Sequence, residues 1–135
     1  MLAKMIDFTA RGDHDGLLVA VEVGREIPFE IKRVFYIFDT AEKVERGFHA
    51  HKELEQVLIC LAGACTILLD DGATRESVRL DDNRKGIYLP PQLWHEMKDF
   101  EKGTVLVSLA SDVYDETDYL RNYDDFRSYW KGGPQ

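Results

Sequence analysis

Short apolar stretches recur along the chain, and clusters of glycine, proline and aspartate separate them at close spacing. Apolar runs of this length, with alternating or continuous hydrophobic positions, are expected to form β-strands. The intervening clusters favour turns, because these residues supply unusual backbone dihedrals and local hydrogen bonds. Roughly eight to ten short strands predict an all-β sandwich or barrel. The strands that we expect span residues 5–8, 17–23, 31–38, 57–61, 65–69, 74–80, 86–89, 93–97 and 104–110.

Three segments refine this picture. Residues 57–61 are continuously apolar, as expected of a strand that is buried on both faces. Residues 11–16 contain two glycines and two aspartates and are expected to form a loop. In residues 31–38 the side chains alternate between two partly apolar faces. One face carries Ile31, Arg33, Phe35 and Ile37, and the other carries Lys32, Val34, Tyr36 and Phe38.

The C-terminal segment has a different periodicity. From Asp115 onward the apolar residues stand three to four positions apart, which is typical of an amphipathic helix. Asp115 or Thr117 can cap its start, and Gly132-Gly133-Pro134 can end it. We expect about three to four helical turns whose aromatic face packs on the outside of the sheet; partner binding through that face is the alternative. The positions concerned are Tyr119, Leu120, Tyr123, Phe126, Tyr129 and Trp130.

Length and composition bound the possible functions. A chain of 135 residues with 44% hydrophobic residues predicts one domain over residues 1–135 with a real core. The formal net charge of -8 argues against a nucleic-acid partner, which needs a basic surface to meet phosphates. An anionic small ligand stays possible where a pocket carries local arginines.

The cysteines and the first residues suggest a compartment. Cys60 and Cys65 lie in apolar, strand-like context, which favours a buried, reduced pair over a disulfide. Residues 1–5 contain no apolar stretch long enough for a signal peptide, and no run is long enough for a membrane helix. We therefore expect a cytoplasmic protein without a membrane partner.

The strongest chemical signal lies between Arg46 and Gln56. His49 and His51 stand two residues apart, and Glu55 follows four residues later. In an extended chain, residues of equal parity share one face, so the two imidazoles and the carboxylate are expected to converge. Such a group makes either a metal site or an acid/base site.

A later histidine can complete the same site. His95 follows a proline-containing turn at the head of a strand, and a second hairpin of a small jelly roll lies across from the first. The metal interpretation takes His49, His51, Glu55 and His95 as ligands of Fe(II), Mn(II), Ni(II) or Zn(II). The rival uses the same residues without metal, as bases near neutral pH. His14 is expected to be a solvated loop residue.

Neighbouring cations favour an anionic substrate. Arg33 and Arg46 lie close in sequence to the histidines, together with Tyr36. Guanidinium groups are natural bidentate partners of phosphate. A pocket that combines them with histidine bases suits proton transfer on a phosphorylated carbonyl compound.

Long stretches of the chain resemble a known family. The His-x-His-x3-Glu block with the later proline and histidine resembles the two sequence blocks of the cupin superfamily. Between about residues 16 and 130 the chain closely resembles the nucleotide-sugar 3,4-ketoisomerases, which are WxcM-like cupins. The segments that carry this resemblance are residues 33–39, 46–56, 94–97 and 110–119.

The resemblance implies a fold and a reaction. The fold would be a cupin jelly-roll barrel with a C-terminal α-helix. The reaction would convert dTDP-4-oxo-6-deoxy-glucose, through an enediolate, into the dTDP-3-oxo-6-deoxy-hexose for the biosynthesis of an unusual deoxysugar. No metal and no cofactor would take part. The implied partners are this dTDP-linked 4-keto-6-deoxy sugar and a second copy of the chain, in a homodimer that exchanges N-terminal strands.

The resemblance also implies roles for individual residues. His49 would remove the C3 proton, and His51 would be the second functional histidine. With Tyr36, these form the expected catalytic set. Glu55 is then expected to orient an imidazole. Substrate-binding roles fall to Arg33, Arg46, Gln56 and His95.

One departure from the family concerns residue 15. Asp15 stands where the family commonly has an arginine that would touch substrate. The configuration of the product at C4 depends on which face of the enediolate is protonated. Residues near positions 15–17 and 95 are expected to set that face.

Overall fold

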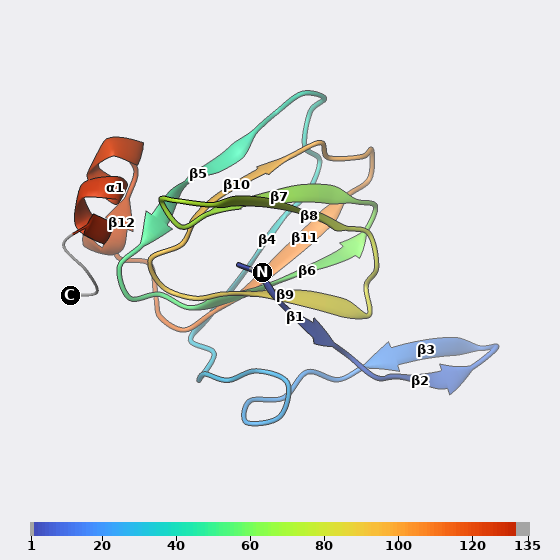
Figure 1. Ribbon diagram of the computed structural model, residues 1–135. Helices are drawn as coiled ribbons and strands as arrows, with labels where there is room; N and C mark the ends of the chain where they lie inside the picture. Colours follow the sequence, from blue (N-terminus) through green and yellow to red (C-terminus); the bar gives the residue numbers. More distant parts are fainter. Residues whose placement is uncertain (1, 132–135) are drawn as a thin grey trace.

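The structure is a computed structural model and describes residues 2–131, apart from the side chains of Trp130 and Lys131. Two five-stranded antiparallel sheets face each other, and one α-helix lies beside one end of them (Figure 1). The first sheet has the order β1-β9-β6-β11-β4, and the second has the order β12-β5-β10-β7-β8. The strands are β1 (Lys4–Asp7), β2 (Ala10–Asp13), β3 (Gly16–Val19), β4 (Arg33–Ile37), β5 (Arg46–His51), β6 (Gln56–Ala62), β7 (Cys65–Asp70), β8 (Arg75–Leu80), β9 (Lys85–Leu89), β10 (Trp94–Lys98), β11 (Val105–Ala110) and β12 (Tyr119–Leu120).

The main core fills the space between the two sheets. Its largest members come from both of them and are completely or almost completely buried: Leu58, Ile67, Leu69, Ile87 and Leu106. Burying each such side chain contributes about 1.5–3 kcal/mol. This arrangement confirms the all-β jelly-roll prediction with a C-terminal helix.

A second cluster covers the outer face of the first sheet. Phe8, Ile27 and Phe29 of the N-terminal region pack against Val57 and Ile59 of β6. Strand β6 is therefore covered on both faces. This double burial explains the continuous run of apolar residues and confirms the expectation for residues 57–60, whereas Leu61 at the end of the run is 48% exposed.

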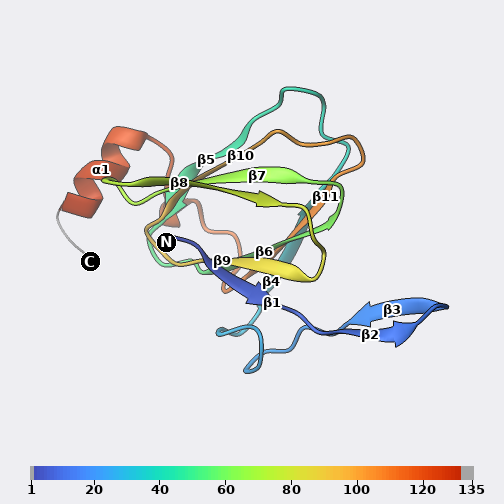
Figure 2. The same ribbon diagram turned by 45° about the vertical axis from the view of Figure 1, so that its right-hand side comes forward.

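The N-terminal region differs from the sequence prediction. Residues 11–16 were expected to form a loop and 17–23 a strand, but β2 and β3 form a hairpin with a two-residue turn between Asp13 and Gly16. Gly12 has a φ of 133°, which a side chain rarely adopts. The glycines and aspartates thus build a tight hairpin. It projects away from the two sheets (Figures 1 and 2) and leaves Leu17 and Leu18 60% exposed.

The tail is also organised differently. Asp115 caps a short 3-10 helix, Glu116–Asp118, rather than the α-helix. Strand β12 follows and pairs with β5, and the α-helix α1 begins only at Tyr123 and ends at Lys131. The carboxylate of Asp118 accepts hydrogen bonds from the backbone N–H groups of Glu53 and Leu54, which fixes the tail against the end of β5. This tertiary contact overrides the helical periodicity of residues 115–122.

The aromatic face of α1 packs on the second sheet, as expected. Phe126 is completely buried, and the rings of Tyr123 and Phe126 lie 5.2 and 5.6 Å from that of Trp94 on β10. The Tyr123 hydroxyl donates to the buried carboxylate of Asp70, 2.7 Å away. The predicted helix end at residues 132–134 lies outside the described residues. Within residues 2–131 no helix has the length and apolar character needed to span a membrane.

Candidate active site

Three histidines converge between the sheets. His49 and His51 share one face of β5, and β10 pairs with β5 so that His95 lies opposite His49. The ring centroids lie 4.9 Å apart for His49 and His51, 4.6 Å for His49 and His95, and 5.7 Å for His51 and His95. The period of two along β5 and the antiparallel register with β10 produce this cluster.

Gly47 makes the close approach of β5 and β10 possible. Its φ is 87°, and a Cβ atom there would lie 2.9 Å from the carbonyl oxygen of His95. The pairing register also shifts beside this point, between His95 and Glu96. A glycine is therefore needed where the two histidine-bearing strands meet.

Burial keeps the histidines neutral. Burial, followed by the nearby charges of His95, His49 and Arg33, lowers the pKa of His51 to about 2. Burial and then the charge of His49 lower the pKa of His95 to about 3. The pKa of His49 is also lowered, mainly by burial. At pH 7 all three imidazoles can act as neutral bases or as neutral hydrogen-bond donors.

These pKa shifts predict a loss of stability in mild acid. Histidines in the unfolded chain titrate near pH 6.5, whereas His51 and His95 in the folded chain stay unprotonated down to about pH 2 and 3. As the pH falls below 6.5, the unfolded state binds more protons, so the free energy of unfolding decreases by up to about 1.4 kcal/mol per pH unit for each histidine. Urea unfolding between pH 7 and 5 measures this slope. The slope should be shallower in His95→Gln and unchanged in His14→Gln; equal slopes in all three proteins would contradict the assignment.

Hydrogen bonds distinguish the ring nitrogens. The Nδ1 atoms of His49 and His95 lie 3.0 and 3.3 Å from the carbonyl oxygens of Gly47 and Leu93. A carbonyl only accepts, so both histidines carry their proton on Nδ1 and keep a lone pair on Nε2. In the described part of the chain, the buried Nε2 atoms of His51 and His95 have no hydrogen-bond partner. Such atoms are expected to meet a ligand.

Two chambers meet at the histidines. A smaller one of about 130 Å³ is lined by His49, His51, His95 and Arg46. A larger one of about 370 Å³ is lined by Arg33 and several acidic residues. His51 and Tyr119 line both chambers, so the two spaces are neighbours. Their combined size falls in the range of small-molecule sites.

Arg33 is held in place but not neutralised. Its guanidinium lies 5.2 Å from the ring centroid of Phe35 and 5.8 Å from that of Tyr114. Its Nε atom is buried and has no partner within residues 2–131. A planar cation held between two rings with a free donor is suited to an anionic ligand.

Three of the acidic residues that line the larger chamber have local partners. Asp112 accepts from the backbone N–H of Val113, and Asp115 accepts from the N–H and hydroxyl of Thr117. Asp118 accepts from two backbone N–H groups beside β5. These hydrogen bonds stabilise the turns around the chamber, and Arg33 remains its cation.

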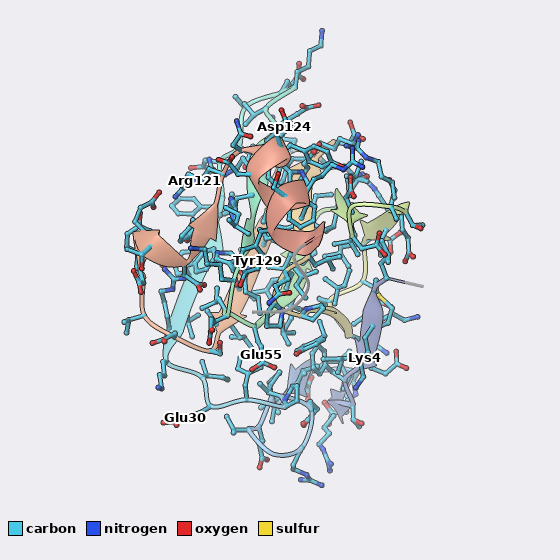
Figure 3. All side chains as sticks on the ribbon, turned by 60° about the vertical axis from the view of Figure 1, so that its left-hand side comes forward. Lys4, Glu30, Glu55, Arg121, Asp124 and Tyr129 are labelled. Atoms are coloured by element: carbon cyan, nitrogen blue, oxygen red, sulfur yellow. The ribbon has the colours of Figure 1, made fainter. Side chains whose placement is uncertain are left out.

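The structure does not bring Glu55 to the histidines. Its carboxylate accepts a hydrogen bond from the Tyr88 hydroxyl at 2.5 Å, and it lies well apart from Arg121 near the start of α1 (Figure 3). Strand β5 ends at His51 and β6 begins at Gln56, so the parity of an extended chain does not persist to residue 55. Its expected role of orienting an imidazole is wrong, and the four-ligand metal set loses its carboxylate. The donor atoms of the three histidines still lie within 4.8 Å of one another.

Tyr36 also lies away from the cluster. It is 63% exposed and packs against Phe38 on the outer face of β4, next to Gly103 and Thr104. Phe35 occupies the inward position and lines the smaller chamber. Within one chain, the alternation of β4 therefore places Tyr36 outside the site, contrary to the catalytic role expected for it.

Gln56 lines the smaller chamber together with the histidines. It is 2% exposed, its Nε2 lies 3.4 Å from His51 Nδ1, and its Oε1 accepts from the Ser108 hydroxyl at 2.9 Å. Its neighbours are thus a histidine and a serine. Its direct contact with substrate stays a prediction, and the structure shows in addition that it contacts His51.

Residues of the tail complete the site. The Tyr119 ring centroid lies 4.4 Å from that of His51 and 5.0 Å from that of His49. Arg121 stacks on Tyr119 at 4.2 Å and is bound in a bidentate manner by Glu116. From the sequence, Tyr119 was expected on the apolar face of a helix that begins near Asp115. Its pairing with β5 could not be read from a helical periodicity.

The jelly roll and its histidine-lined cavity define a cupin-type enzyme. The protein family described as FdtA, WxcM-like, C-terminal, matches residues 1–131. The chain belongs to this family. It is 54% identical over 126 residues to the TDP-4-oxo-6-deoxy-alpha-D-glucose-3,4-oxoisomerase of Aneurinibacillus thermoaerophilus, which covers 93% of this chain and 91% of the relative.

The solved structures that this chain resembles include sugar-nucleotide 3,4-ketoisomerases. The structure matches a histidine-to-asparagine variant of the 3,4-ketoisomerase QdtA from Thermoanaerobacterium thermosaccharolyticum, in complex with TDP-4-keto-6-deoxyglucose. The TM-score is 0.95 at 42% identity, over 98% of this chain and 96% of the other. It also matches the TDP-quinovose 3,4-ketoisomerase WlaRB from Campylobacter jejuni, with a TM-score of 0.89 at 48% identity over 93% and 97%. The RmlC epimerase of Mycobacterium tuberculosis, at 20% identity and a TM-score of 0.75, shares the fold.

Proposed function

We propose that the protein is a sugar-nucleotide 3,4-ketoisomerase that converts dTDP-4-oxo-6-deoxy-glucose into the dTDP-3-oxo-6-deoxy-hexose. The observation that carries the proposal is the cluster of three neutral histidines, two of them with buried, unpartnered Nε2 atoms within the described residues, beside Arg33 and Arg46. Relatives at 42–54% identity are named for this reaction or bind its substrate. The product would serve the biosynthesis of an unusual deoxysugar.

The reaction needs one base and one donor at the sugar. His49 is only partly buried, and its Nε2 lone pair is available, so it is placed to remove the proton from C3. The C3–H electron pair forms a C3=C4 double bond while the charge moves to the C4 oxygen. The proton of the C3 hydroxyl then passes to the C4 oxygen, and the proton held by the base is returned at C4, which leaves a ketone at C3 and a hydroxyl at C4. The atoms balance without any oxidant or reductant.

The two chambers suggest how the substrate lies. We assign the hexose to the smaller chamber, where Arg46 and the histidines line the wall. The nucleotide extends into the larger chamber, where Arg33 can pair with the diphosphate. Binding energy from the nucleotide would hold C3 against His49. His95 lies beside His49 and is the candidate for contact with the reacting carbons.

Incubation with dTDP-4-oxo-6-deoxy-glucose in deuterated water tests the proposal. Proton NMR should show a ketone at C3 and deuterium at C4, because the migrating proton passes through a solvent-exchangeable base. A parallel incubation in ordinary water leaves a proton at C4, and its coupling to the C5 proton gives the configuration of the product. An unchanged substrate spectrum under conditions where the nucleotide sugar binds would contradict the proposed activity.

A metal-dependent cupin reaction is the second candidate, because the three histidine donors are close enough to hold a divalent ion. The metal-free mechanism predicts that the purified enzyme keeps its full rate after dialysis against a chelator. Elemental analysis of the same sample measures residual iron, manganese, nickel and zinc. If the purified enzyme contains stoichiometric metal, loses its activity when the chelator removes that metal and regains activity when the metal is added back, the alternative is established.

The projecting hairpin supports a homodimer with exchanged N-terminal strands. Leu17 and Leu18 are 60% exposed on β3 of a single chain, and burying them against a second copy would remove this apolar surface from water. Leu17→Asp together with Leu18→Asp should shift the protein to the monomer mass in analytical ultracentrifugation. Lys102→Asp is a control with an exposed charge in the turn before β11, and a dimer that survives the double variant would contradict this interface.

The protein is also proposed to act in the cytoplasm. Cys60 and Cys65 are free thiols in the buried core. Unpaired cysteines are usual in reducing compartments. Fractionation of the native host should recover the enzyme with the soluble cytoplasmic proteins.

A further inference from the structure

Ser108, Gln56 and His51 form a buried chain of hydrogen bonds behind the candidate site. Ser108 is 1% exposed, Gln56 is 2% exposed and His51 is 4% exposed. The Ser108 hydroxyl donates to Gln56 Oε1 at 2.9 Å, and Gln56 Nε2 lies 3.4 Å from His51 Nδ1. Strand pairing places them together, because β6 carries Gln56 and the adjacent β11 carries Ser108.

The direction of these bonds fixes the proton on His51. A side-chain amide accepts through oxygen and donates through nitrogen. Since Gln56 accepts from Ser108 with its oxygen, its nitrogen donates to His51 Nδ1. A neutral imidazole that accepts at Nδ1 carries its single proton on Nε2. That Nε2 atom is buried and has no partner within the described residues.

His51 thus differs from its two neighbours. His49 and His95 donate through Nδ1 to carbonyl oxygens and present Nε2 lone pairs. The donor atoms of the three rings lie within 4.8 Å of one another. A third lone pair there would repel the other two, whereas an N–H group is complementary to them. The cluster then contains two bases and one neutral donor.

We infer that Ser108 and Gln56 hold His51 in the tautomer with its proton on Nε2, so that His51 donates a hydrogen bond to the oxygen that becomes negative in the enediolate. This inference rests on the isomerase function that we propose for the same site. Ser108 and Gln56 are positioning residues, and His51 is the group that touches substrate. A neutral imidazole is an effective donor to such an oxygen, because it needs no proton from solvent. With Nε2 protonated, His51 also offers no lone pair to a metal ion at this atom.

Nitrogen-15 NMR of the imidazoles in the unmodified enzyme tests the tautomer directly. We expect a pyrrole-type shift at Nε2 and a pyridine-type shift at Nδ1 of His51, at pH 7. His49 and His95 should show the opposite pattern and serve as internal references. Variants that lack one histidine at a time assign the signals. A pyridine-type Nε2 in His51 would overturn the inference whether or not the enzyme is active.

Gln56→Glu tests the consequence for catalysis. A carboxylate at this position can only accept, so it draws the proton of His51 to Nδ1 and removes the donor from Nε2. We expect kcat to fall about tenfold with little change in KM, and the His51 nitrogen shifts to exchange their pattern. Ser108→Ala should show a smaller change of the same kind, and Ser77→Ala, on an exposed position of β8, should show none.

These measurements separate the possible failures. Wild-type turnover in Gln56→Glu with an inverted tautomer would show that His51 is not the donor. The expected tautomer in a protein without isomerase activity would leave the geometry correct but contradict the proposed function. If Gln56→Glu does not fold, the wild-type spectrum and Ser108→Ala still decide the question.

Discussion

His49→Asn is expected to abolish exchange of the C3 proton of dTDP-4-oxo-6-deoxy-glucose with deuterated solvent. Asparagine keeps a similar shape but has no basic nitrogen, so the step that breaks the C3–H bond loses its base. Base catalysis contributes about 10²–10⁴-fold, and kcat should fall by at least the lower figure. Nucleotide binding should persist, because His49 lines the smaller chamber and Arg33 the larger one. Deuterium uptake by NMR and calorimetric titration with dTDP measure the two effects.

A matched control exists for this variant. His14 is solvent-exposed at the tip of the N-terminal hairpin, and neither chamber at the histidines includes it. His14→Asn should therefore exchange at the wild-type rate. Retained exchange in His49→Asn would assign the base to another residue. His95 would be next, because its Nε2 also carries a free lone pair.

Arg33→Met is expected to weaken dTDP binding roughly 100-fold while leaving the chemical step nearly intact. Methionine preserves the contact with Phe35 and Tyr114 but removes the cation from the larger chamber. A hydrogen bond to a charged group is worth about 1.5–3 kcal/mol, and the upper value corresponds to this change in Kd. Titration calorimetry with dTDP measures it, and kcat at saturating substrate should change less than the affinity.

Two other arginines make the result specific. Arg127 is exposed on α1, and Arg127→Met should bind dTDP normally. Arg46 lines the smaller chamber, so Arg46→Met should weaken the nucleotide sugar more than dTDP alone. Equal losses of dTDP affinity in Arg33→Met and Arg127→Met would show that the nucleotide does not lie in the larger chamber.

The histidine pair could be predicted because it depends on a single strand. His49 and His51 lie on one face of β5 by the period of two, and no other element is needed to establish that. The prediction for Glu55 is wrong because the same parity argument holds only within one continuous strand. The strand ends before it, and the turn between β5 and β6 redirects its side chain to Tyr88.

The alternation of side chains along β4 already argues against placing Arg33 and Tyr36 in one pocket. It places Arg33 and Tyr36 on opposite faces, so one strand could not present both to the same pocket. Which face turns inward depends on the packing of β4 against the opposite sheet. The structure places Arg33 and Phe35 on the inner side, and this choice could not be made from the strand alone.

The tail shows the strongest effect of tertiary contacts. Its aromatic spacing predicts one continuous helix from Asp115, but the α-helix α1 forms only from Tyr123 onward. Residues 119–120 instead gain backbone hydrogen bonds by pairing with β5. The weak local preference for helix does not compete with these bonds and with the Asp118 contacts.

The all-β class, the burial of most of β6 and the shared face of His49 and His51 could be predicted from the sequence, because they follow from local periodicity. Only the folded chain shows that His95 lies opposite His49, that Glu55 and Tyr36 lie elsewhere, and that Tyr119 and Ser108 belong to the site. These residues are far apart in the chain, and only strand register and sheet packing bring them together. The proton positions of the three histidines depend on the same register, since each is set by a neighbour that folding supplies.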